Sequence, residues 1–157
     1  MSVRAYLALG SNLGDKQAQL DEAVRRLRAT KGIEVRRVSK YVTTKALLPP
    51  DDPRPQPDYL NAVVELDTTL AAPALLAAVK QLEKELGRAD ATRWAPRLID
   101  IDLLLYGKEV IDTQGLRVPH AEMHKRRFVL EPLAELAPQL AHPLLGRTVR
   151  ELLEALG

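Results

Sequence analysis

The chain has 157 residues, enough for one domain with a buried core, and it is 46% hydrophobic and 28% charged, as ordinary globular proteins are. Its net charge of +2 does not demand a polyanionic partner, although most of its basic residues are arginine, which suits a local phosphate pocket. The absence of cysteine excludes disulfides, a thiolate nucleophile and cysteine zinc sites. We therefore expect one domain, residues 1–157, in a cytoplasmic protein that binds neither nucleic acid nor membrane.

The first half of the chain predicts three strands and one helix. Residues 4–10 alternate as a short strand that stops at a glycine, and residues 11–30 repeat apolar residues at helical spacing. Residues 33–44 and 59–69 alternate with period two and predict two further strands. The proline-rich stretch 45–58 between them predicts a long loop, of the kind that often has a function.

The second half adds one long helix, one strand and a helical end. Residues 72–88 predict a helix with a proline near its start and a glycine near its end. Residues 98–106 predict a strand, and residues 123–138 and 148–157 predict short helices. The order β-α-β-β-α-β predicts an α+β, ferredoxin-like fold, in which two helices pack on an antiparallel sheet, with short C-terminal helices added.

Two aspartates interrupt the apolar strand in the stretch RWAPRLIDIDLLLYG. Side chains two residues apart point to the same face of a strand, so Asp100 and Asp102 should converge while Ile99, Ile101 and Leu103 cover the other face. One interpretation is a salt-bridged pair on a solvated face. The other is a Mg²⁺ site, since hard cations take carboxylate oxygens and leave positions for substrate phosphates.

The same stretch resembles the signature of the 6-hydroxymethyl-7,8-dihydropterin pyrophosphokinase family. Three further segments resemble that family in the same order: AYLALGSNLGD, QPDYLNAVVELDTTL and VPHAEMHKRRFVLEPLAELAP. The resemblance covers nearly the whole chain and implies a ferredoxin-like fold. It also implies a monomer that transfers pyrophosphate from ATP to the hydroxymethyl group of a reduced pterin, with two Mg²⁺ ions.

The resemblance also implies a role for individual residues. Asp100 and Asp102 would hold the two Mg²⁺ ions, and Arg88 and Arg97 would be catalytic. The pterin would be bound by Thr44, Leu47, Tyr59, Asn61, Trp94 and Phe128. ATP would be bound by Glu83, Arg97, Leu103, His120 and Arg126.

Several of these residues have a second interpretation. Phe128 is the only phenylalanine and could equally be a core residue, whereas two rings can sandwich a flat pterin and Asn61 can pair with its amide-like edge. His124 and His142 match no motif position and are expected at the surface.

A ferredoxin-like RNA-binding or small-molecule regulatory module remains the alternative function, although the acidic strand would repel phosphates unless metals intervene.

The chain departs from the family pattern at several positions, among them Lys45, where the family commonly has proline. Asp90 stands where a second loop arginine is common, Ala95 replaces the glycine of the signature, and Ala121 replaces a larger residue. The departure at Asp90 places more of the expected phosphate clamping on Arg88 and Arg93.

Overall fold

One antiparallel sheet organises the computed structural model, which describes residues 2–12, 14–44, 58–87 and 99–157. The sheet consists of strands β1 (Val3–Ser11), β2 (Ile33–Val38), β3 (Val42–Thr44), β4 (Tyr59–Thr68) and β5 (Asp100–Tyr106). Its order is β2-β4-β1-β5, with β3 paired to the other end of β4. This is the strand order of the ferredoxin-like fold, so the predicted fold class is confirmed.

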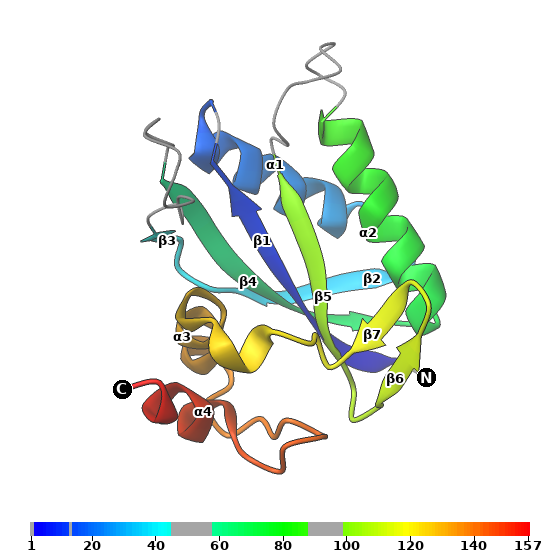
Figure 1. Ribbon diagram of the computed structural model, residues 1–157. Coiled ribbons are helices and arrows are strands. Elements are labelled where there is room, and N and C mark those ends of the chain that lie inside the picture. The colour runs from blue at the N-terminus through cyan, green and yellow to red at the C-terminus, as the bar shows by residue number, and fades with distance from the viewer. Residues whose placement is uncertain (1, 13, 45–57, 88–98) are drawn as a thin grey trace.

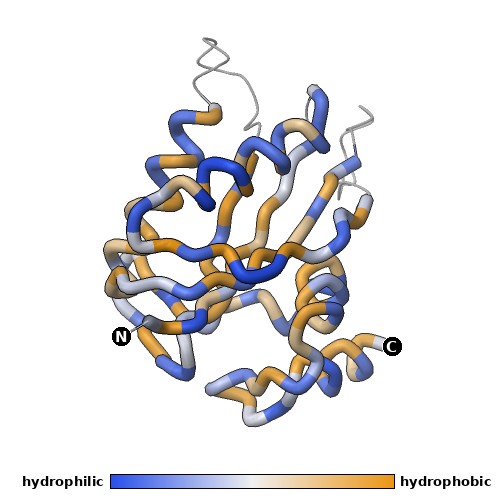
Figure 2. The backbone as a smooth tube through the Cα atoms, turned by 180° about the vertical axis from the view of Figure 1, so that it is seen from behind, coloured by the Kyte–Doolittle hydropathy of each residue, from blue (hydrophilic) through white to orange (hydrophobic). Residues whose placement is uncertain are grey.

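Two helical layers cover opposite faces of this sheet (Figure 1). Helices α1 (Lys16–Arg28) and α2 (Ala72–Gly87) pack on one face, where Leu7, Leu9 and Ile101 belong to the main core. Helices α3 (Arg127–Leu136) and α4 (Val149–Ala155) form a second core on the other face with Val63 and Leu104. Figure 2 shows the alternation of hydrophobic and hydrophilic residues along these elements, which lets each of them bury one side.

Some elements differ from the sequence prediction in their boundaries, and one hairpin is added. Residues 33–44 do not form one strand, since β2 and β3 pair with different parts of β4 on either side of a break. The first helix begins at Lys16, because residues up to Ser11 continue β1 and the Asp15 side chain accepts the Ala18 N–H as the helix cap. A hairpin of β6 (Ile111–Thr113) and β7 (Leu116–Val118) was not predicted, because three-residue strands are too short to show a periodicity.

The C-terminal helices confirm the prediction for that end of the chain. A short 3-10 helix (Met123–Lys125) leads into α3, and Thr148 and Glu151 cap α4 with reciprocal hydrogen bonds. Within the described ranges, no helix is both long and apolar enough to cross a membrane.

His142 is buried, so its expected place at the surface is wrong. Its side chain is only 4% exposed, and its Nδ1 accepts the backbone N–H groups of Leu144 and Leu145 at 3.2 and 3.1 Å. Burial and the neighbouring His124 ring lower the pKa of His142, which favours the neutral ring that these two hydrogen bonds need. The residue therefore shapes the turn before α4.

A buried carboxylate joins the sheet to α3. Glu65 on β4 is 3% exposed and accepts hydrogen bonds from the Tyr6 hydroxyl at 2.8 Å and from the Arg37 guanidinium at 3.0 and 3.1 Å. Arg37 also donates to the backbone carbonyl of Leu136 at the end of α3. Burial alone would raise the pKa of Glu65, but the hydrogen bonds from Arg37 and Tyr6 hold it below its usual value.

We expect Glu65→Gln to lower the free energy of unfolding by about 1–3 kcal/mol at about pH 7, because it removes the charge that Arg37 and Tyr6 bind. A folded-state pKa below the ordinary 4.5 means that this stabilisation is present above that value and is lost as the pH falls through the lowered one. Urea unfolding at about pH 7 and about pH 3 should therefore show the two proteins converging at the lower pH.

Glu34→Gln is the matched control, because the Glu34 side chain is 71% exposed and pairs with Arg36, which is itself exposed. It should leave the unfolding curve almost unchanged. A difference between wild type and Glu65→Gln that is as large at about pH 3 as at about pH 7 would contradict the charge-based account.

Candidate active site

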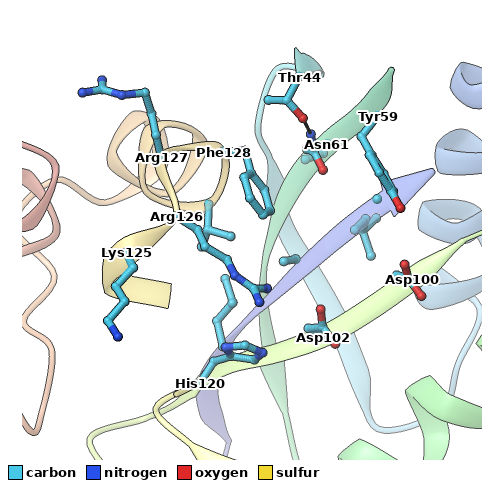
Figure 3. Close-up of a pocket in the computed structure, with 16 residues that line it drawn as sticks. Thr44, Tyr59, Asn61, Asp100, Asp102, His120, Lys125, Arg126, Arg127 and Phe128 are labelled. Atoms are coloured by element: carbon cyan, nitrogen blue, oxygen red, sulfur yellow. Dashed lines mark hydrogen bonds between the residues drawn. The ribbon is translucent and has the colours of Figure 1, made fainter. Parts of the chain in front are cut away.

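A pocket of about 520 Å³ lies on the face of the sheet that carries α3, beside the N-terminal end of that helix. Its floor comes from β1, β4 and β5, and its side comes from the segment that joins β7 to α3 (Figure 3). Most of the described residues expected at the site line it: Thr44, Tyr59, Asn61, Asp100, Asp102, His120, Arg126 and Phe128. The size is that of pockets for small-molecule ligands.

The two aspartates project from β5 into this pocket. Ile99, Ile101 and Leu103 are at most 4% exposed and belong to the core under α1 and α2, so Asp100 and Asp102 lie on the opposite face. The predicted convergence of the two carboxylates is therefore present. Leu103 does not line the pocket, and its expected contact with ATP stays a prediction.

A β-bulge sits next to the aspartates and positions His120. Leu103 pairs with Leu7 and Leu105 pairs with Tyr6, which leaves Leu104 as an extra residue without a partner in β1. The Leu104 carbonyl accepts the backbone N–H of His120 at 2.9 Å. This hydrogen bond ties the segment after β7 to the strand that carries the aspartates.

His120 and Arg126 bring hydrogen-bond donors toward the carboxylates. The Nδ1 atom of His120 accepts the Glu122 backbone N–H at 3.2 Å, so the neutral ring carries its proton on Nε2. Burial lowers the pKa of His120, and the charge of Arg126 adds to this effect, whereas Asp102 opposes it. Figure 3 shows the Arg126 side chain extending past Phe128 toward Asp102 and His120.

The other end of the pocket presents an amide between two aromatic rings. Asn61 is 6% exposed, and its Nδ2 donates to Thr44 Oγ1 at 2.7 Å and to the Val42 carbonyl at 3.4 Å. Phe128 and Tyr59 lie on either side of this amide in Figure 3. A Cβ atom on Gly10 would stand 3.2 Å from Asn61 Oδ1, so the glycine leaves room for the amide beside β1.

Glu83 lies outside the pocket, on α2. Its Oε2 atom accepts the Ile101 backbone N–H at 2.8 Å and the Lys80 ammonium at 3.3 Å. The same ammonium donates to the Ile101 carbonyl at 2.7 Å and lies 3.7 Å from Asp102 Oδ1. Glu83 therefore holds the strand between the two aspartates, and its expected contact with ATP stays a prediction.

Some residues of the site were not predicted from the sequence. Lys125, Arg127 and Gly10 line the pocket, and Lys80 reaches Asp102 from the other side of the strand. The basic run before Phe128 was a signal for the first two residues, whereas nothing in the local pattern identified Lys80. Leu47, Arg88, Trp94 and Arg97 lie outside the described residues, as do Lys45, Asp90, Arg93 and Ala95.

The carboxylates fit a divalent metal in their chemistry. Hard cations such as Mg²⁺ take oxygen ligands, commonly one or two carboxylates together with substrate phosphates and water. Asp102 is 43% exposed and already faces a cation, the Lys80 ammonium. Over the part of the chain that the structure describes, no three or more His, Cys, Asp or Glu side chains gather into a metal cluster, so the two aspartates would be the main protein ligands here.

The chain is similar to proteins of one enzyme family over most of its length. Residues 6–138 match the family model of 7,8-dihydro-6-hydroxymethylpterin-pyrophosphokinase (HPPK). The 2-amino-4-hydroxy-6-hydroxymethyldihydropteridine pyrophosphokinase of Methylorubrum extorquens is 46% identical over 154 residues, 98% of this chain and 93% of that protein. The protein of the same name from Synechocystis is 39% identical over 150 residues, 96% of this chain and 74% of that protein.

Solved structures resemble the chain in fold. A crystal structure of HPPK-DHPS from Plasmodium falciparum matches with a TM-score of 0.75 and 16% identity, covering 99% of this chain but only 44% of that longer chain. Another, of the wild-type Plasmodium falciparum protein with pterin and p-hydroxybenzoate, matches with a TM-score of 0.72 and 16% identity, covering 98% and 43%. These solved structures support the fold, whereas the family model and the curated relatives show that the chain belongs to the 7,8-dihydro-6-hydroxymethylpterin-pyrophosphokinase family.

Proposed function

We propose that the pocket on the α3 face of the sheet is the active site for the reaction of this family. The chain is a pyrophosphokinase of folate biosynthesis that transfers pyrophosphate from ATP to the hydroxymethyl group of 6-hydroxymethyl-7,8-dihydropterin and releases AMP. The family and the named relatives do not favour the RNA-binding or regulatory alternative. The observation that carries the proposal is one pocket with an amide between two rings at one end and two carboxylates at the other.

The pterin would lie between Phe128 and Tyr59. A flat heteroaromatic ring stacks on aromatic side chains, and its amide-like edge needs a partner that both donates and accepts. Asn61 would supply the acceptor, its Oδ1 atom, because its Nδ2 atom donates to Thr44 Oγ1 and to the Val42 carbonyl, and these hydrogen bonds fix the orientation of the amide. Leu47 and Trp94 would complete this end of the site.

The phosphates of ATP would lie at the other end, over Asp100 and Asp102. These carboxylates would hold two Mg²⁺ ions with the nucleotide, as the family's need for a divalent metal suggests. Bound there, the ions would neutralise charge on the phosphate oxygens during the in-line displacement. The two aspartates would keep a fixed orientation, because their strand packs in the core and is also hydrogen-bonded to Lys80 and Glu83 of α2.

Arg126 and His120 would bind phosphate oxygens beside the metal site. Arg126 offers a charged fork of N–H donors, and neutral His120 offers its Nε2 proton. Arg88 and Arg97 would act at the transferred group, where positioning and charge provide most of the catalysis. Glu83 and Leu103 remain proposed contacts of ATP although neither lines the pocket, and no protein nucleophile is required.

We further propose that the 157 residues act as one domain and as a monomer in the cytoplasm, where ATP is available. The decisive test of function is an assay of AMP release with ATP, Mg²⁺ and 6-hydroxymethyl-7,8-dihydropterin. AMP that forms only with the pterin present would support the transfer, whereas AMP formed equally without it would contradict it. Light scattering during size-exclusion chromatography tests the monomer.

We expect Asp102→Asn to lower kcat for AMP release by about 10²–10³, the scale for removing one preorganised charge at a reaction centre. The melting temperature of the metal-free protein should hold or rise, because the substitution removes the repulsion from Asp100 at a side chain that is 43% exposed. Asp112→Asn is the control, since Asp112 is an exposed aspartate on β6. A large loss of stability without loss of turnover would contradict the metal role.

We expect Phe128→Ala to weaken pterin binding by about 1–3 kcal/mol, the range for losing a stacked ring. Binding of a non-hydrolysable ATP analogue should change far less, and Phe128→Tyr should restore pterin affinity because it restores the ring. Calorimetric titrations with each ligand separate the two effects. Equal losses for both ligands would show that Phe128 acts as a core residue.

We expect Arg88→Ala to lower kcat by about 10²–10³ with little change in pterin affinity, because Asp90 leaves Arg88 to stabilise more of the developing charge. Single-turnover kinetics of Arg88→Ala and Arg93→Ala compare the two loop arginines directly. Turnover of Arg88→Ala within a few-fold of wild type would transfer this role to Arg93.

A further inference from the structure

Lys80 on α2 contacts strand β5 at two points and Glu83 of its own helix at a third. Its ammonium donates to the Ile101 carbonyl at 2.7 Å, lies 3.3 Å from Glu83 Oε2 and lies 3.7 Å from Asp102 Oδ1. Glu83 in turn accepts the Ile101 N–H at 2.8 Å. The two helix side chains therefore bind both backbone groups of Ile101, the residue between the two aspartates.

This arrangement is possible because β5 is an edge strand. Among the strands that the structure describes, the order is β2-β4-β1-β5, so β5 pairs with β1 alone, and the backbone groups on its other side need partners from elsewhere. The side chain of Ile101 is fully buried in the core under α1 and α2. Lys80 and Glu83 thus reach the edge of the sheet from the helix face, and the ammonium passes that edge to reach Asp102 on the pocket face.

The charge of Lys80 is placed where it acts on the aspartates. Two carboxylates on one face of a strand repel each other, and a nearby cation reduces that repulsion. A short hydrogen bond to the Ile101 carbonyl holds the ammonium beside Asp102. A divalent cation bound to Asp102 would then meet a second positive charge a few ångströms away.

We propose that Lys80 is a positioning residue that serves as the resident counter-cation of Asp102 and sets the affinity of the carboxylate pair for divalent metal. This inference rests on the metal site proposed above. Without metal, Lys80 offsets the repulsion between Asp100 and Asp102 and fixes their strand. With metal, its charge weakens binding, so that the metal is held firmly only when the phosphates of the nucleotide add their own ligands.

The test measures metal binding rather than turnover. Mn²⁺ serves as the probe, since its electron paramagnetic resonance signal reports the free ion, and it is titrated into the whole protein without nucleotide. Lys80→Met removes the ammonium but keeps an unbranched side chain, and Lys80→Arg keeps the charge. Lys84→Met is the matched control, because Lys84 is an exposed lysine one turn further along α2.

We expect Lys80→Met to lower the Mn²⁺ dissociation constant by about three- to tenfold, the effect of removing a unit charge a few ångströms from a divalent ion in a solvated site. Lys80→Met should also lower the melting temperature of the metal-free protein, measured in the presence of a chelator. The rise in melting temperature on adding Mn²⁺ should then be larger than in wild type. Lys80→Arg and Lys84→Met should keep wild-type values in all three measurements.

Three results would overturn the role. An unchanged or higher Mn²⁺ dissociation constant in Lys80→Met, with a melting temperature lowered equally with and without Mn²⁺, would mean that Lys80 only fastens α2 to the strand. The Asp102→Asn variant distinguishes a failure of the proposed role of Lys80 from a failure of the proposed metal site. Wild-type Mn²⁺ binding that survives Asp102→Asn, or no binding by wild type at all, would overturn the site and the role of Lys80 with it.

Discussion

Strand β5 has to satisfy two opposite demands at once, and the rest of the site is built around that constraint. One of its faces is fully apolar and belongs to the core under α1 and α2, while the other carries two carboxylates separated by a single residue. Burying both carboxylates without compensation would cost several kcal/mol. In the described part of the sheet, the strand lies at the edge, and its acidic face lines a pocket. At that edge, Lys80 and Glu83 bind the backbone groups of Ile101 that face away from β1.

The pocket collects groups from distant parts of the chain because the sheet places them side by side. Asn61 on β4 is directly opposite Gly10 on β1, which is directly opposite Asp100 on β5. These three residues thus form one row across three strands. At one end of the row is the amide proposed to hydrogen-bond with the pterin, and at the other is a carboxylate proposed to bind metal. The bare backbone at Gly10 separates the two groups without a side chain between them. In the proposed function, pterin and phosphates would thereby take adjacent places on one sheet surface.

The second core holds the remaining wall of the pocket in place. Arg126 and Phe128 stand at the start of α3, and the other end of that helix is tied to the sheet through Arg37 and the buried Glu65. Tyr6 adds a hydrogen bond to the same carboxylate, and burial raises the pKa of its hydroxyl to about 12, so it remains a donor. A helix fixed at its far end by charged hydrogen bonds can present its first residues in one orientation.

By itself, the sequence determined the fold class, the shared face of Asp100 and Asp102, and the family. These follow from periodicity within single elements and from motif residues that stand close together in the chain. Tertiary structure alone decided that Lys80 reaches Asp102 around a strand edge, that Gly10 makes room for Asn61, and that His142 is buried in a turn. It also decided where β2 ends and β3 begins, because both pair with β4. The physical reason is that a periodic pattern reports which side of its own element a residue occupies, whereas its partners are brought there by other elements that pack against it.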